Sequence, residues 1–255
     1  MERIKIFLPD ILTGINICIG FTCIILVLQV PRVTGTFHHN YIVSAWLVVI
    51  AAMIDGFDGA LARRLGKTGP FGIEFDSLAD LTAFAIAPGT LLYAFFYQGH
   101  SVFFVLVPLL YVICSAYRLA RFNTSAIQVS QKKLIGLATP VSAVIVVAVV
   151  LLVANFYQRG VLQEVSWSTR GVITGVVLII SLLMVSSIEF ITFDKYCFGN
   201  KKRLILLFFV IIVPLLLLRF KFPAASVLIV GLFYIAECLG RWLLRTRTAH
   251  SKNKT

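Results

Sequence analysis

Charged residues are scarce in this chain: only 13% of its 255 residues are Asp, Glu, Lys or Arg. Acidic residues are especially few, with 11 against 23 basic ones, whereas 59% of the residues are hydrophobic. A water-soluble domain of this length could not bury so much apolar surface. The composition therefore excludes a soluble globular protein and predicts a polytopic membrane protein without a separate soluble domain.

Cysteine pairs of the kind that bind zinc or form redox centres are also lacking. The five cysteines are scattered and mostly lie within apolar segments, and no C-x-x-C motif occurs. We interpret them as small apolar residues of the helices, not as disulfides or metal ligands. No small-residue cleavage site follows the basic start of the chain, so residues 1–10 are predicted to be a retained interfacial segment.

Long apolar runs dominate what is present. They are separated by short loops that contain Gly, Pro, Lys and Arg, and each run is near the ~20 residues that a spanning helix needs. They cover residues 11–29, 41–65, 74–96, 102–122, 134–156, 170–190, 203–219 and 223–240. The sequence predicts an all-α bundle of about eight transmembrane helices, with one membrane domain over residues 1–240 and a basic tail over 241–255.

The positive charge is distributed unequally between the two sides of this predicted bundle. The net charge is +12, and 18 of the 23 Lys and Arg residues fall on the side that holds both termini. Cytoplasmic loops of membrane proteins are enriched in such residues, so both termini are predicted to be cytoplasmic. Basic loops that contact lipid headgroups also account for the net charge, and a nucleic-acid partner is not expected.

Four aspartates interrupt the second and third apolar runs. Asp55 and Asp58 are three residues apart, and Asp76 and Asp80 are four apart, so each pair shares one face of a helix. A carboxylate within a bilayer is energetically costly and is by default functional and partnered. All four lie toward the predicted cytoplasmic ends of their helices.

Carboxylate oxygens at this density suit Mg²⁺ or Mn²⁺, and no His or Cys lies nearby to favour zinc. Two such ions would neutralise the four carboxylates and bind a diphosphate, the arrangement used for in-line displacement at phosphorus. The alternative is that these acids form buried salt bridges with Arg63, Arg64 or Lys67. Four acids in register favour the metal site.

The complete spacing is D-x2-D-G-x2-A-R-x8-G-x3-D-x3-D, from Asp55 to Asp80. It resembles the signature of the CDP-alcohol phosphatidyltransferases, which transfer a phosphatidyl group from a CDP-linked lipid to an alcohol and release CMP. The resemblance implies that the four aspartates hold the metals, that Asp80 is also the general base, and that the enzyme is a homodimer. It places the remaining motif residues against the CDP group; these are Gly59, Ala62, Arg63 and Gly72.

A second polar stripe lies on the first apolar run, where Pro9, Thr13, Asn16 and Gly20 share one narrow helical face. Thr13 and Asn16 could hydrogen-bond a nucleotide, and Gly20 admits close packing. A packing seam between helices would explain the same pattern. The segment resembles the P-N-x2-T-x2-N-x3-G start of some family members, with Asp10 where Asn is usual, and this resemblance favours Thr13 and Asn16 as nucleotide contacts.

The fourth run ends in YRLARFN, in which Arg118 and Arg121 are three residues apart. A guanidinium pair can bind a carboxylate or phosphate bidentately, although anchoring at the cytoplasmic surface would explain any Lys or Arg here. With GLATP (136–140) and LMVSS (183–187), this segment resembles the membrane-embedded phosphatidylserine synthases of the family. Arg118, Arg121 and Asn123 are therefore candidate contacts for serine or phosphate.

The resemblance implies transfer of the phosphatidyl group from CDP-diacylglycerol to the hydroxyl of L-serine, at an active site that faces the cytoplasm from the inner membrane. Two alternatives stay open. One is transfer to another alcohol, such as glycerol 3-phosphate or an inositol phosphate, because the aspartate motif does not distinguish acceptors. Intramembrane acids also suit a divalent-cation transporter, although such sites usually lie near mid-membrane between internal repeats, and no repeat is visible here.

Overall fold

The structure is a computed structural model that describes residues 2–31, 38–65, 69–99, 101–128, 134–162 and 165–190, with a few single residues between 228 and 240. The side chains of 2–9, 57–65, 70, 125–128, 134–135 and 189–190 are not among those described. The predicted seventh span, most of the eighth and the basic tail lie outside the described residues. Gly231, in the eighth, is helical and lies against Ile145.

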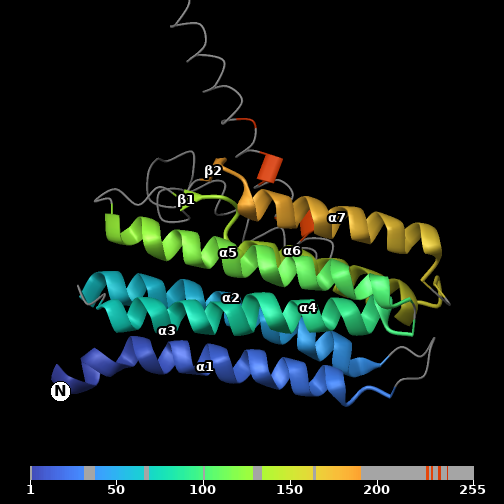
Figure 1. The fold of residues 1–255 in the computed structure, drawn as a ribbon. Helices are drawn as coiled ribbons and strands as arrows, with labels where there is room; N and C mark the ends of the chain where they lie inside the picture. The colour runs from blue at the N-terminus through green and yellow to red at the C-terminus, as the bar shows by residue number, and fades with distance from the viewer. Residues whose placement is uncertain are drawn as a thin grey trace, which may run out of the picture.

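Long helices make up almost all of the described chain, which confirms the all-α prediction (Figure 1). The α-helices are α1 (Glu2–Leu28), α2 (His39–Leu65), α3 (Pro70–Asp80), α4 (Ala87–Leu92), α5 (Leu106–Gln128), α6 (Thr139–Gln158) and α7 (Trp167–Val185). Shorter turns of other pitch are the π-helices η1 (Leu81–Ile86) and η2 (Tyr93–Tyr97) and the 3₁₀-helix η3 (Val102–Val105). Two short strands, β1 (Leu134–Ile135) and β2 (Glu189–Phe190), pair antiparallel.

Six helical segments among the described residues are long and apolar enough to cross a membrane. They are Asp10–Leu28, His39–Gly56, Phe71–Tyr97, Val102–Thr124, Thr139–Gln158 and Trp167–Val185. They match the first six predicted spans, and the protein is therefore a multi-pass membrane protein. The first helix already begins at Glu2, so the segment predicted to be interfacial is continuous with the first span.

The fifth span begins later than predicted, at Thr139 instead of residue 134. Residues 134 and 135 form β1, and Gly136 has a φ of +81°, a backbone conformation that side chains other than glycine rarely adopt. Pro140 then lies in the first turn of α6, where its missing N–H leaves no intrahelical hydrogen bond unmade. Hydrophobicity alone does not distinguish this loop from the helix that follows it.

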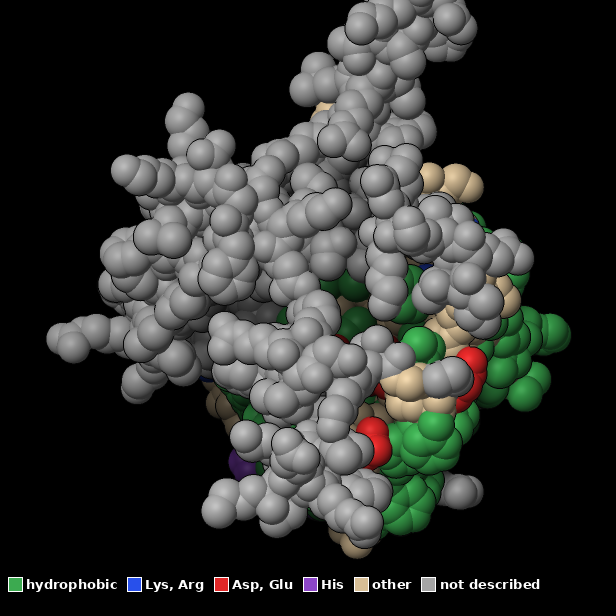
Figure 2. Space-filling view, turned by 90° about the vertical axis from the view of Figure 1, so that its left-hand side faces the viewer, with side chains coloured by type: hydrophobic (Ala, Val, Ile, Leu, Met, Phe, Trp, Pro, Cys, Tyr) green, Lys and Arg blue, Asp and Glu red, His purple; other side chains and the backbone are tan. Residues whose placement is uncertain are grey.

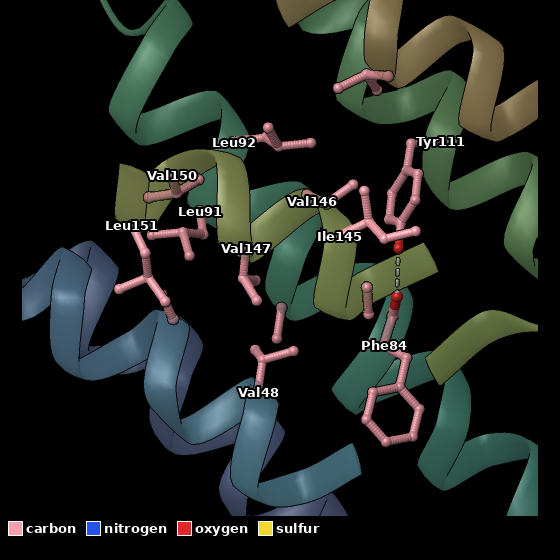
Figure 3. Packing of buried hydrophobic residues seen from close by; sticks show 14 of the residues in the cluster. Val48, Phe84, Leu91, Leu92, Tyr111, Ile145, Val146, Val147, Val150 and Leu151 are labelled. Carbon is pink, nitrogen blue, oxygen red and sulfur yellow. Dashed lines mark hydrogen bonds between the residues drawn. The ribbon is translucent and has the colours of Figure 1, made fainter. Parts of the chain in front are cut away.

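The helices lie side by side, and the N-terminus and the β1–β2 pair lie at the same end of the bundle (Figure 1). The core between the helices is apolar, with Val48, Leu91, Leu92, Tyr111 and Val147 buried (Figure 3). Large apolar side chains elsewhere are exposed on the outside of the bundle, as expected for a surface that meets lipid. Examples are Phe21, Met53, Val172 and Leu182.

The first helix and the third span approach each other very closely at Gly20. A Cβ atom at Gly20 would lie 2.8 Å from the Cα of Ala83, which leaves no room for any side chain. Small residues allow helices in membranes to make such contacts between backbones. The predicted close packing at Gly20 is confirmed, and it fixes α1 against η1, directly after the aspartates of α3.

Candidate active site

Three of the four predicted metal ligands converge. Asp55 comes from α2, and Asp76 and Asp80 come from α3. Each offers one carboxylate oxygen, and these three atoms all lie within 4.8 Å of one another, with each side chain partly buried. The backbone of Asp58, Gly59, Ala62 and Arg63 continues α2, but their side chains lie outside the described residues.

This cluster fits a divalent cation by charge and by donor type. At an effective dielectric constant of about 20, two carboxylates at such a separation repel each other by about 3–4 kcal/mol. A bound cation would offset this repulsion, and an all-oxygen donor set suits Mg²⁺ or Mn²⁺. The alternative of pairing with Arg63, Arg64 or Lys67 concerns side chains outside the described residues.

The acidic cluster lies toward the end of the bundle that holds the N-terminus. Figure 2, which faces this end, shows acidic side chains at the surface beside apolar ones. In the third span, Asp76 and Asp80 come before the buried apolar residues Phe84, Leu91 and Leu92. The carboxylates are therefore placed off-centre along the bundle, as the sequence predicts.

The first helix runs in the same direction as the third span beside this cluster. A Cβ atom at Gly72 would lie 3.9 Å from Oδ1 of Asp10, and Gly20 meets Ala83 further along. Thr13 and Asn16 lie between these two contacts on α1, as Asp76 and Asp80 do on α3. The two predicted nucleotide contacts are thus at the level of the carboxylates.

Asn16 has a property that the sequence does not reveal. Its side chain is only 2% exposed, and its Oδ1 has no hydrogen-bond partner among the described residues. Buried polar atoms are almost always hydrogen-bonded, and an exception calls for a missing ligand, water or ion. The amide oxygen of Asn16 is therefore suited to a polar ligand that enters the acidic site.

Helix α5, which forms the fourth span, lies antiparallel to the third span and is joined to it by polar contacts. Nδ2 of Asn123 donates to Oγ of Ser77 at 3.0 Å and to Oε2 of Glu74 at 3.3 Å. Further along, the hydroxyl of Tyr111 donates to the main-chain oxygen of Phe84 at 2.8 Å. Asn123 thus links α5 to the helix of Asp76 and Asp80, a contact that its predicted role in substrate binding does not include.

Arg118 lies on α5 between these two contacts, and therefore near the level of Asp80. Its side chain is only 5% exposed. Nη1 donates to Oγ1 of Thr139 at 2.6 Å, and the guanidinium carbon lies 5.6 Å from the ring centre of Phe122. A buried guanidinium is stable only beside compensating polar or negative groups. This environment favours a role in binding an anionic group over simple anchoring at the surface.

Arg121 reaches a different part of the molecule, although it is only three residues away. Its guanidinium donates to the main-chain oxygens of three residues at the end of α7, at distances of 2.8–3.2 Å. These residues are Met184, Val185 and Ser186. The last carbonyls of a helix lack intrahelical donors and carry partial negative charge, so a cation there caps the helix. The two arginines therefore do not share a partner among the described contacts.

The three segments that carry the subfamily resemblance meet at this point. The N–H of Gly136 donates to the carbonyl of Ile188 at 2.9 Å, and that of Leu137 donates to Leu183 at 3.1 Å. A Cβ atom at Gly136 would collide with the carbonyl of Met184 and lie 2.7 Å from Nη2 of Arg121. YRLARFN, GLATP and LMVSS thus form one packed unit. Sequence reasoning named these segments but missed the contact of Thr139 with Arg118, and it missed Tyr111 and Ser142 as buried polar residues beside them.

Comparison with known proteins agrees with this geometry. A relative named CDP-diacylglycerol–serine O-phosphatidyltransferase, from Helicobacter pylori strain J99, is 32% identical over 220 residues, which is 85% of this chain and 87% of the relative. An archaetidylserine synthase from Methanothermobacter thermautotrophicus is 31% identical over 187 residues, or 72% of this chain and 70% of the relative. The sequence model of CDP-alcohol phosphatidyltransferases matches residues 6–187. The match contains both the acidic cluster and the packed unit, and the chain belongs to the CDP-alcohol phosphatidyltransferase family.

Proposed function

We propose that this protein is a phosphatidylserine synthase, which transfers the phosphatidyl group of CDP-diacylglycerol to the hydroxyl of L-serine and releases CMP. The observation that carries this proposal is the convergence of three carboxylates, within 4.8 Å, at the level of the buried guanidinium of Arg118. The names of the relatives, which cover most of the chain, support serine as the acceptor.

The carboxylates of Asp55, Asp58, Asp76 and Asp80 would hold Mg²⁺ or Mn²⁺, and we infer two ions from their number. The bound ions would supply positive charge that binds the diphosphate of the liponucleotide and stabilises the charge that develops on its oxygens. The family generally uses a divalent metal, and the acidic cluster of this chain offers the oxygen donors for it.

The nucleotide would lie along α1 and the start of α3. Asn16 and Thr13 are buried polar side chains at the correct level, and the unpaired Oδ1 of Asn16 could accept a hydrogen bond from the cytidine amino group or a ribose hydroxyl. Small residues of the motif would allow the ligand to approach the backbone. We assign this role to Gly59, Ala62 and Gly72, and a contact with the CDP group to Arg63.

Serine brings a carboxylate that needs a cation, and Arg118 is the residue that we propose to bind it. A guanidinium fixed by Thr139 and Phe122 is already oriented, so little side-chain entropy is lost on binding. Arg121 and Asn123 were expected to share this role. Arg121 contacts the end of α7 and Asn123 contacts α3, so we propose that both support the acceptor site without touching serine.

Asp80 would act as the general base. It would accept the proton of the serine hydroxyl while the hydroxyl oxygen forms a bond to the lipid-bearing phosphorus and the bond from that phosphorus to CMP breaks. Among the described residues the cluster consists of aspartates only, so we expect direct displacement without a covalent intermediate. A phosphatidylated enzyme trapped with labelled liponucleotide would contradict this.

The charge distribution supports cytoplasmic termini, an active site that opens to the cytosol, and an inner-membrane location. Serine and the liponucleotide would then reach the site from the cytosol and the inner leaflet. We also propose a homodimer, on the basis of family membership.

The decisive experiment offers purified protein CDP-diacylglycerol with one acceptor at a time and measures CMP. We expect CMP release with L-serine and Mg²⁺ or Mn²⁺, and none after chelation of the metal. Release only with glycerol 3-phosphate or an inositol phosphate would assign a different acceptor. Metal flux into proteoliposomes without CMP release would instead indicate a divalent-cation transporter.

A further inference from the structure

The third span changes its helical pitch directly after Asp80. Residues Leu81–Ile86 form the π-helix η1, in which the N–H of Ala87 bonds to the carbonyl of Thr82, five residues back. Such turns contain one more residue than an α-helical turn, and in proteins they occur frequently at functional sites. The π turn therefore sets the rotation of Asp76 and Asp80 relative to the buried residues of α4.

The sequence provides a cause for this irregularity. In an α-helix the carbonyl of Phe84 would accept a hydrogen bond from the N–H of residue 88, but this residue is Pro88 and has no N–H. The proline ring also clashes with the carbonyl four residues before it. Phe84 has no exposed surface, so a donor from a neighbouring helix can stabilise its buried carbonyl in place of the N–H that residue 88 lacks.

The hydroxyl of Tyr111 provides this donor. It bonds to the carbonyl of Phe84 at 2.8 Å, and the tyrosine is entirely buried on α5 (Figure 3). On the other side, Gly20 of α1 presses against the Cα of Ala83. The π turn is thus held between two neighbouring helices at consecutive residues.

The same hydroxyl belongs to a buried polar chain that leads to Arg118. It lies 3.3 Å from Oγ of Ser142, which donates to the carbonyl of Thr139 at 2.8 Å. Oγ1 of Thr139 accepts from Arg118. Tyr111 therefore lies between the turn that follows Asp80 and the residues beside Arg118.

We propose that Tyr111 is a positioning residue for the acidic site: its hydroxyl replaces the N–H that Pro88 lacks, keeps Leu81–Ile86 in the π conformation, and so orients the carboxylate of Asp80 toward the bound cation. The step to the cation rests on the proposed function. Without the hydroxyl, the carbonyl of Phe84 loses the hydrogen bond from Tyr111, the π turn becomes less stable, and Asp80 spends less time in the geometry that binds metal.

The first test measures the affinity of the whole protein for Mn²⁺ by electron paramagnetic resonance. Tyr111→Phe should weaken binding about fivefold, as expected from the loss of one hydrogen bond. Tyr97→Phe is a matched control, because Tyr97 is equally buried and its hydroxyl lies 2.8 Å from Oγ1 of Thr174, near the opposite end of the same span. Its Mn²⁺ affinity should stay within about twofold. Unchanged affinity in a folded Tyr111→Phe protein would overturn the proposal.

A second test uses hydrogen–deuterium exchange and needs no variant. Addition of Mn²⁺ to the wild-type protein should slow exchange in residues 81–87 but not in η2, a second π turn at the opposite end of the same span from the aspartates. Equal exchange with and without Mn²⁺ in residues 81–87, in a protein that binds Mn²⁺, would refute the coupling. CMP release is measured separately, so a protein that passes both tests but has no transferase activity would refute the proposed function and not the role of Tyr111.

Discussion

Nη1 of Arg121 donates a hydrogen bond to the main-chain oxygen of Val185 at 2.8 Å, so a charged side chain of α5 caps the C-terminal end of α7. Sequence spacing places Arg121 on the same helical face as Arg118, and a shared role in substrate binding follows naturally from that spacing. In the described contacts Arg118 donates to Thr139, whereas Arg121 donates to the end of α7. Their substitution should therefore have separable effects.

Replacement of Arg121 should mainly affect stability. Arg121→Ala removes three hydrogen bonds from a charged donor and leaves the last carbonyls of α7 uncapped, which should lower the free energy of unfolding by about 2–4 kcal/mol. Arg121→Lys should retain only part of the stabilisation by the cap, because one ammonium group cannot bond to the same three carbonyls. Thermal unfolding in detergent measures the change. A melting temperature equal to that of the wild type would contradict the capping role.

Replacement of Arg118 should mainly affect the acceptor. If its guanidinium binds the serine carboxylate, Arg118→Ala should raise the KM for serine about tenfold or more and change the KM for CDP-diacylglycerol much less. Steady-state CMP release with each substrate varied in turn gives both constants. The same rise in both KM values would show that Arg118 supports the site as a whole and does not select the acceptor.

Gly136 and Gly160 form a matched pair of glycines with positive φ, +81° and +68°. A Cβ at Gly160 would meet nothing within 4 Å, so Gly160→Ala should cost only the backbone penalty, about 1–2 kcal/mol. Gly136→Ala adds a collision with the carbonyl of Met184 and should cost clearly more. Denaturation of the two variants in parallel measures the difference. Equal losses of unfolding free energy in the two variants would show that the carbonyl of Met184 moves away from the new Cβ at no energetic cost.

The acidic cluster should lower the stability of the metal-free protein and increase the stability gained when metal binds. Without metal, Asp76→Asn should be at least as stable as the wild type, because one of three mutually repelling carboxylates is gone. At about 100 times the dissociation constant, Mn²⁺ should stabilise the wild type by about 2.7 kcal/mol and the variant much less. Glu74→Gln removes an exposed carboxylate from the same helix and should keep the gain. Stabilisation of Asp76→Asn by Mn²⁺ at the wild-type level would exclude Asp76 as a ligand.

Asn123 and Ser77 should act as one unit. Ser77 and Asn123 exchange hydrogen bonds of 3.0 and 3.1 Å, so either substitution by alanine breaks the same contact. Each should lower the free energy of unfolding by about 1 kcal/mol, and the double variant should lose less than the sum. A double-mutant cycle measures this coupling. Strict additivity would show that Asn123 acts independently of α3, for example through the substrate.

The two aspartate pairs were predictable because the geometry within each pair is local. Residues three or four apart on a helix share a face whatever the rest of the fold does, and the cost of a charge in the membrane forces such faces inward. Asp55, Asp76 and Asp80 meet as expected. The first six spans were also predictable, since length and hydropathy suffice to identify them.

The polar contacts between helices were not predictable in the same way. Pro88 predicts an irregular turn in the third span. The hydroxyl that donates to the carbonyl of Phe84 belongs to Tyr111, which is 27 residues away in the sequence. Arg118 and Arg121 lie on one face, yet their long side chains reach partners on α6 and α7 that no local spacing specifies. Tertiary contacts decided these roles.

The short β1–β2 pair brings Leu134 beside Phe190, at opposite ends of the segment that contains α6 and α7. These two helices therefore form a closed loop whose two ends are tied together at the edge of the proposed acceptor site, next to the Arg121 cap. Any motion that widens this site must move α6 and α7 together or break the β1–β2 pairing. Cleavage of the connection between α6 and α7 would leave both helices attached to each other through that pairing.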